Sequence, residues 1–186
     1  KRAAESESEG MKCIMGMRDL LQTLDANLAK ALEYSWAIAK KEWLPTLNME
    51  SESYGGQPHL ESVEEWMDRI ADSCRPIWSK HGPHPFGFNA LEIYLALCAA
   101  LFHDIGRGRP TSPDQPEKKH GKISREIVEA HWAQLGIHNG RIAHELGLIV
   151  EFHTEKDAWR HHDVTVIHPW GIVHVEAIAS LLTLAD

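Results

Sequence analysis

A histidine and an aspartate, His103 and Asp104, directly follow the most apolar stretch of this 186-residue chain. The ten residues before them, 93–102, are apolar or nearly so, and the polar segment after them contains Gly106 and Arg107. Burial disfavours an imidazole or a carboxylate unless each finds a partner. The doublet therefore marks a place where hydrogen bonds or a bound ion must compensate for buried polar groups.

Five segments in all, this one included, align a histidine or a carboxylate with an apolar helical stripe. Residues 3, 4, 7, 8 or 11 positions apart share one face of an α-helix. At such offsets, His59 aligns with Val63, Trp66 and Ile70, Asp104 with Ile93, Leu97 and Ala100, His120 with Ile123, Ser124 and Ile127, His153 with Ile142, Leu146 and Ile149, and Asp186 with Val175, Ile178 and Leu182. A single buried histidine is ordinarily satisfied by a carbonyl, but five such segments are harder to explain in that way.

A shared cation is the simplest partner for imidazoles and carboxylates that meet inside a fold. It neutralises the carboxylates and binds each imidazole in its neutral form through a ring nitrogen. Histidine is also the commonest metal ligand, and the chain contains 13 histidines, most of which we expect at the surface or at helix caps. The pattern therefore predicts a metal site built from several helices.

Other catalytic motifs do not fit. The segment His144–Leu148 begins like the zinc-protease motif HExxH but has leucine in place of the second histidine. The segment "GRGRPTS" lacks the Gly-Lys-Ser/Thr of a phosphate-binding loop, and the chain contains no GxSxG and no CxxC. Nothing in the sequence selects a catalytic triad.

Composition limits the class of protein. The net charge of −8 argues against a broad nucleic-acid surface, although it allows a small basic pocket. Three widely spaced cysteines, Cys13, Cys74 and Cys98, are expected to be reduced thiols. No stretch approaches the roughly 20 apolar residues of a membrane span, and the first residues lack the apolar core of a signal peptide. We therefore expect a cytoplasmic protein without a membrane partner.

Apolar periodicity predicts an all-α fold, a helical bundle. Pro45 should end the first helix, Gly106 should end the central one, and "DVTVI" is expected to form a short extended piece. The expected helices span residues 17–44, 58–72, 90–104, 121–135, 139–153 and 173–186.

The same reading divides the chain into three parts. These are a flexible tail at 1–16, a helix and loop at 17–57 that pack on the bundle, and a metal-binding domain at 58–186. The last helix stops on its apolar stripe at Asp186, so we expect the domain to be truncated at that end.

In this order, His59, the His103-Asp104 doublet in "HDIGRG" and Asp186 resemble the H...HD...D signature of the HD superfamily of metal-dependent phosphohydrolases. The resemblance covers about residues 58–186. It implies a helical bundle in which these four residues bind a divalent metal and Asp104 bridges to a second metal. It also implies His120 and His153 as ligands of the second metal. Mn, Fe, Mg, Ni, Co and Zn are not distinguished by such ligands.

His131 competes with His120 for this role. The two residues are 11 positions apart and therefore face the same way, but they are separated by roughly 16 Å along a helix axis. Only one of them can reach the cluster. We favour His120, because a histidine followed four positions later by Ser or Gly and then by apolar residues is similar to the family pattern.

The resemblance implies a phosphohydrolase or phosphodiesterase that acts on a nucleotide or another small phosphoester. Two cations about 3.5 to 4 Å apart would turn a bridging water into a hydroxide nucleophile. Asp104 and Arg107 are the expected catalytic residues, with Arg107 gripping phosphate oxygens or, alternatively, complementing a helix dipole. Arg109, Lys118 and Lys119 are candidates for a phosphate-facing rim, although a solvated charge cluster is the more common role for any one of them. Glu155 and Asp157 are candidate acceptors for ligand histidines.

Two other functions stay open at this stage. One is a single-strand nuclease similar to the HD nuclease of CRISPR systems, which the acidic balance disfavours. The other is a catalytically inactive HD module that senses a metal or a nucleotide within a longer chain. The Gly-Tyr-Pro signature of cyclic di-GMP phosphodiesterases does not follow His153, so that subfamily is not supported.

Overall fold

Helices make up almost all of the regular structure. The computed structural model describes residues 15–46, 56–78, 87–108, 120–154, 165–167, 169 and 171–186. Within these residues the α-helices are α1 (Met17–Leu24), α2 (Ala26–Ile38), α3 (Gln57–Trp78), α4 (Ala90–Phe102), α5 (His120–His131), α6 (Gly140–Phe152) and α7 (Val175–Ala185). The predicted all-α class is therefore confirmed.

The remaining elements are short. A π-helical turn (Ala39–Trp43) and a 3-10 turn (Leu44–Thr46) continue α2, and a second 3-10 turn, η3 (Ile105–Gly108), follows α4. Strands β1 (Thr165–Ile167) and β2 (Gly171–Val173) form an antiparallel hairpin in which Thr165 pairs with Val173. The extended piece expected at "DVTVI" is thus confirmed in part, as β1.

The first predicted helix is two helices. The chain breaks at Asp25, whose extended backbone separates α1 from α2. The Asp25 side chain accepts hydrogen bonds from the backbone N–H groups of Asn27 and Leu28, which caps α2. The apolar period continues across the break, which is why periodicity alone predicted one helix. Pro45 lies in the 3-10 turn just beyond, close to the predicted end.

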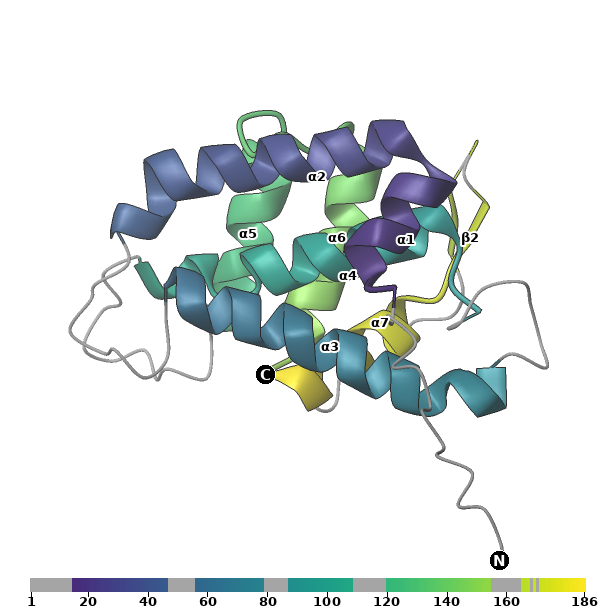
Figure 1. Ribbon diagram of the computed structural model, residues 1–186. Coiled ribbons are helices and arrows are strands. Elements are labelled where there is room, and N and C mark those ends of the chain that lie inside the picture. Colours follow the sequence, from purple (N-terminus) through teal and green to yellow (C-terminus); the bar gives the residue numbers. More distant parts are fainter. Residues whose placement is uncertain are drawn as a thin grey trace, which may run out of the picture.

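Helix α4 is the centre of the bundle. Every residue from Leu91 to Phe102 is buried, and α4 contacts α1, α2, α3, α6 and α7. Figure 1 shows α4 between α2 and α3, with α5 and α6 behind it. Because apolar residues cover the whole circumference of α4, burial on every side is the arrangement that its composition requires. The end of this helix is where the His103-Asp104 doublet lies.

Glu92 fixes the beginning of both α4 and α7. Its carboxylate accepts a hydrogen bond from the Asn89 backbone N–H at 2.8 Å, and the Asn89 side chain accepts from the Glu92 N–H, forming a capping box. The other Glu92 oxygen accepts from the N–H of His174 at 2.9 Å and from His174 Nδ1 at 2.6 Å. His174 is the N-cap residue of α7. This buried carboxylate therefore anchors the helix that delivers Asp186.

Gly106 does not end α4 in the way that we predicted. Its backbone is not among the left-handed glycines, and it lies inside η3, after α4 has ended at Phe102. A Cβ at position 106 would lie 2.5 Å from the carbonyl oxygen of His120 and 2.9 Å from Ser124 Oγ. Glycine is required here because α5 approaches the chain closely, and not because a helix stop needs a positive φ.

The prediction that Trp66 lies on the inward face of α3 was wrong. This side chain is 50 % exposed, whereas Leu60, Val63 and Met67 are buried. The buried stripe is rotated toward α4 and α7, the helices that α3 contacts, and it leaves Trp66 at its edge. His59 nevertheless lies at the edge that faces the bundle, with 19 % of its side chain exposed. Helix α3 also continues to Trp78, beyond the predicted end at Asp72.

Several predictions fall on other parts of the chain. Residues 1–14 of the predicted tail, Cys13 and the side chain of Cys74 lie outside the described residues. Cys98 is a free, buried cysteine of α4. Burial raises the pKa of its thiol to about 12, so it stays protonated and unreactive. None of the helices in the described ranges is long and apolar enough to cross a membrane.

Candidate metal centre

His103 is held by the last turn of α4. Its backbone N–H donates to Ala99, and its fully buried ring donates from Nδ1 to the carbonyl oxygen of Ala100 at 2.9 Å. A carbonyl oxygen can only accept, so one proton of the ring stays on Nδ1. Nε2 is therefore the nitrogen that His103 can offer to a cation.

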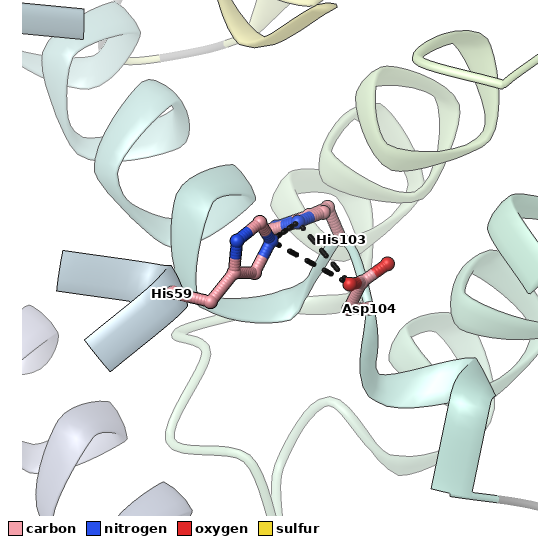
Figure 2. Close-up of side chains that lie close together, drawn as sticks. All are labelled: His59, His103 and Asp104. Carbon is pink, nitrogen blue, oxygen red and sulfur yellow. Dashed lines mark hydrogen bonds and ion pairs between the residues drawn. The ribbon is translucent and has the colours of Figure 1, made fainter. Parts of the chain in front are cut away.

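The first group of side chains consists of His59, His103 and Asp104. His59 Nε2 lies 3.2 Å from His103 Nε2. Asp104 Oδ2 lies 3.7 Å from the Nε2 atom of His59 and 3.6 Å from that of His103. Figure 2 shows the two rings and the carboxylate turned toward one another. The three groups come from α3 and from the turn after α4, which are far apart in sequence.

Asp186 adds a second carboxylate to the first group. It is the C-cap residue of α7, and its Oδ1 atom lies 3.2 Å from His59 Nε2 and 3.4 Å from His103 Nε2. Hydrogen bonds from His103 and His59 hold the pKa of the Asp186 carboxyl well below its usual value. The aspartate is therefore ionised at neutral pH and can act as an anionic ligand.

The second group consists of Asp104, His120 and His153. His120 begins α5 and His153 caps the end of α6, and their Nε2 atoms lie 3.1 Å apart. Asp104 Oδ1 lies 3.2 Å from His120 Nε2. His153 also donates from Nδ1 to a backbone carbonyl three residues earlier, that of Val150. His103 and His153, the two buried histidines, are thus each oriented by the helix that carries them, with Nε2 facing the cluster.

Asp104 belongs to both groups. Its side chain is 1 % exposed, and neither oxygen has a hydrogen-bond partner of normal geometry in the described part of the chain. Arg107 Nε forms an ion pair with Oδ1 at 2.7 Å. Burial alone would raise the pKa of Asp104, but the His120 ring 3.2 Å from Oδ1 and the charges of His103 and Arg107 lower it to about 2. One ionised carboxylate therefore faces two histidine pairs.

The two buried histidines differ in their affinity for a proton. Burial alone would lower the pKa of His103, but the hydrogen bond to Asp186 and the charges of Asp104 and Asp186 raise it. Burial, together with the charges of His103 and His120, lowers the pKa of His153 to about 4. A cation in the first group therefore competes with a proton for His103, whereas His153 is neutral at physiological pH.

The donor set fits divalent cations. In each group the candidate ligand atoms, one per residue, lie within 4.8 Å of one another. Nitrogen donors at about 2.1 Å from one cation and roughly 90–110° apart lie about 3.0–3.4 Å from each other. The two Nε2–Nε2 distances fall in this range. Among the described residues Asp104 finds no hydrogen bond of normal geometry, and a buried charge of this kind is one that a cation satisfies.

All six predicted metal ligands lie in this cluster, and Arg107 lies beside it. His131 does not: it lies at the far end of α5, and its Nδ1 atom is 2.9 Å from Gln134 Oε1. Arg109, Lys118, Lys119, Glu155 and Asp157 lie outside the described residues.

The sequence analysis missed the groups that orient the ligand histidines. These are the backbone carbonyl oxygens of Ala100 and Val150, each three positions before a ligand. Side-chain identity carries no signal for them, because every residue has a carbonyl. The only available clue was that both histidines follow directly on a helix end, where the last carbonyls lack helical partners.

The bundle and its histidine-aspartate cluster define an HD-type domain. A family model of the HD-CE domain matches residues 44–186, so the chain belongs to the HD-CE family. The predicted resemblance to the HD superfamily is thereby confirmed. No curated protein and no solved structure gives a significant match to the chain.

Proposed function

We propose that this protein is a metal-dependent phosphohydrolase or phosphodiesterase that acts on a nucleotide or another small phosphoester. The observation that carries the proposal is the position of Asp104, whose two oxygens face separate histidine pairs. Membership of an HD-type family supports the hydrolytic class. A carboxylate shared in this way suits a site that holds two cations side by side.

Each cation would have its own ligands from this chain. His59, His103, Asp186 and Oδ2 of Asp104 would hold the first, and His120, His153 and Oδ1 of Asp104 would hold the second. When bound, divalent cations lower the pKa of water and neutralise phosphate oxygens. The residues of the chain orient the site: the Ala100 and Val150 carbonyls fix the rings of His103 and His153.

Arg107 has two roles in this proposal. Its Nε group pairs with Asp104 Oδ1 and so holds the carboxylate between the histidine pairs. The guanidinium carries further N–H groups, and 37 % of the side chain is exposed. Such a group can donate to a phosphate oxygen while it stays paired through Nε. Arg107 would therefore orient Asp104 and bind the substrate phosphate.

The substrate class rests on charge. The net charge of −8 disfavours a long polyanionic strand, which needs a basic surface to release counterions. Small phosphoesters need only a local positive site, which the cations and Arg107 would supply. Mononucleotides, cyclic dinucleotides and simple phosphodiesters are therefore the first substrates to test.

The test is hydrolysis by protein stripped with a chelator and reloaded with one divalent metal at a time. The panel contains mononucleotides, cyclic dinucleotides, bis-p-nitrophenyl phosphate and single-stranded DNA. We expect turnover of a small phosphoester that falls at least 100-fold in His103→Ala and Asp104→Ala. His131→Ala is the matched control, because it removes a histidine of the same chain that is far from the cluster, and it should keep full activity.

Three results would argue against the proposal. Cleavage confined to single-stranded DNA would identify a nuclease. Metal-dependent thermal stabilisation with no turnover of any substrate would favour a sensor module. Equal activity in the parent protein and Asp104→Ala, with circular dichroism unchanged, would remove the cluster from the chemistry altogether.

A further inference from the structure

The hydroxyl of Ser124 contacts residues 103–106, the turn that carries Asp104 and is called the Asp104 turn below. Ser124 is one helical turn after His120 in α5 and is fully buried. Its Oγ atom donates to the carbonyl oxygen of His103 at 2.6 Å and accepts from the backbone N–H of Gly106 at 2.9 Å. A single side chain on α5 therefore bonds to the chain on both sides of Asp104.

These two hydrogen bonds satisfy backbone groups that the end of α4 would leave without helical partners. The carbonyl of His103 belongs to the last turn of that helix, where C=O groups lack intrahelical donors. Both the carbonyl and the Gly106 N–H are buried around a turn that must keep one geometry for Asp104 to face both histidine pairs. Ser124 thus closes the turn from outside the helix.

Two glycines bring α5 close enough for this contact. A Cβ on Gly106 would approach the His120 carbonyl oxygen to 2.5 Å, and a Cβ on Gly121 would approach the carbonyl oxygens of Val150 and Glu151 to 3.0 Å. The beginning of α5 is therefore held between the Asp104 turn and the end of α6, which carries His153. His120 stands between these two contacts, so its ring position depends on how α5 is fixed to the turn.

We propose that Ser124 is a positioning residue for the second cation. It keeps the Nε2 atom of His120 within 3.2 Å of Asp104 Oδ1, whereas the first group takes its other ligands from α3, the end of α4 and α7. The proposal rests on the two-cation site proposed above. The ring of His103 is held separately by the Ala100 carbonyl. Within the described residues the Ser124 hydroxyl bonds to no residue of α3 or α7, so its loss should weaken the second cation selectively.

The test is a titration of metal-free protein with Mn²⁺. Calorimetry measures the affinity of each equivalent, and electron paramagnetic resonance detects the coupled manganese pair. For Ser124→Ala we expect the first equivalent to bind within threefold of the parent affinity. The second should weaken at least tenfold, and the signal of the coupled pair should disappear. Ser124→Cys, which keeps a weak donor and acceptor, should recover part of that signal.

Ser35→Ala is the matched control, since Ser35 is also a fully buried helical serine but belongs to α2. It should bind both equivalents like the parent. If the parent itself binds no Mn²⁺, the proposed function fails. If the parent binds two and folded Ser124→Ala also binds two with parent affinity, only the role of Ser124 fails. Equal weakening of both equivalents, or loss of folding in both Ser124→Ala and Ser124→Cys, would also overturn the proposed role of Ser124. Either result would show that the hydroxyl supports the fold as a whole.

Discussion

His120 Nε2 and Asp104 Oδ1 lie 3.2 Å apart, although one residue begins α5 and the other lies in the turn after α4. The same carboxylate presents its other oxygen to His59 and His103. A single buried aspartate is therefore the point at which the two halves of the cluster meet. The consequences of this sharing can be measured.

Replacing Asp104 should affect both cations at once. Asp104→Asn keeps the size of the side chain but removes its negative charge, so we expect both metal equivalents to bind at least 100-fold more weakly, about 2.7 kcal/mol each. Calorimetric titration with Mn²⁺ measures this. Asp68→Asn is the control, because Asp68 is a partly buried carboxylate that accepts from the Met17 N–H away from the cluster. Loss of one equivalent only would contradict the shared role of Asp104.

The histidines of the two groups should separate the cations. His59→Ala is expected to remove the first equivalent and His120→Ala the second, because each supplies a ligand to one group only. His131→Ala should change neither, since its ring contacts Gln134. Metal content after dialysis, measured by mass spectrometry, decides the question. Loss of metal in His131→Ala with retention in His120→Ala would reverse the assignment between these two histidines.

A methyl group at Gly106 should strain the contact between the Asp104 turn and α5. Its Cβ would meet backbone atoms of His120 and Ser124 at 2.5 and 2.8 Å, and overpacking of this kind costs about 1–3 kcal/mol. Urea unfolding of Gly106→Ala measures the cost. Gly140→Ala, whose nearest neighbour would be an atom of Trp132 at 3.6 Å, should change stability by less than about 1 kcal/mol. Equal stability of the two variants would contradict the close approach.

His153 should make the metal-free protein less stable on acidification. Its pKa is about 4 in the folded protein against an ordinary value of 6.5, so the unfolded chain binds more protons between these values. Stability attributable to His153 is therefore complete above pH 6.5 and is lost as the pH falls toward 4.

The raised pKa of His103 acts in the opposite sense, because its contribution is complete below pH 6.5 and is lost at higher pH. Comparison with His153→Gln isolates the His153 effect. Urea unfolding of chelator-treated protein at several pH values should show a smaller loss in this variant between pH 6.5 and 4. The same loss in both proteins would show that His153 is not buried as a neutral group.

The helical class and the inward-facing residues could be predicted from the sequence, because both follow from apolar spacing along each helix. His153 and Asp186 extend stripes whose members are buried, and those stripes lie within single helices. Prediction failed where contacts outside a single apolar stripe determine where a helix breaks or which face is buried. Asp25 breaks a continuous apolar period by capping α2, and Trp66 is exposed because the contacts of α3 with α4 and α7 rotate its buried face.

Periodicity along a helix says which way a side chain faces, and the residue types say which chemistry it offers. Together they indicated five of the cluster residues, and the resemblance to the HD signature added His103 and favoured His120 over His131. They could not show that Asp104 divides its oxygens between two histidine pairs, or that Ser124 and two glycines set the distance between them. Those relationships depend on how closely α5 packs against the end of α4 and against α6, and interhelical packing leaves no period in the sequence.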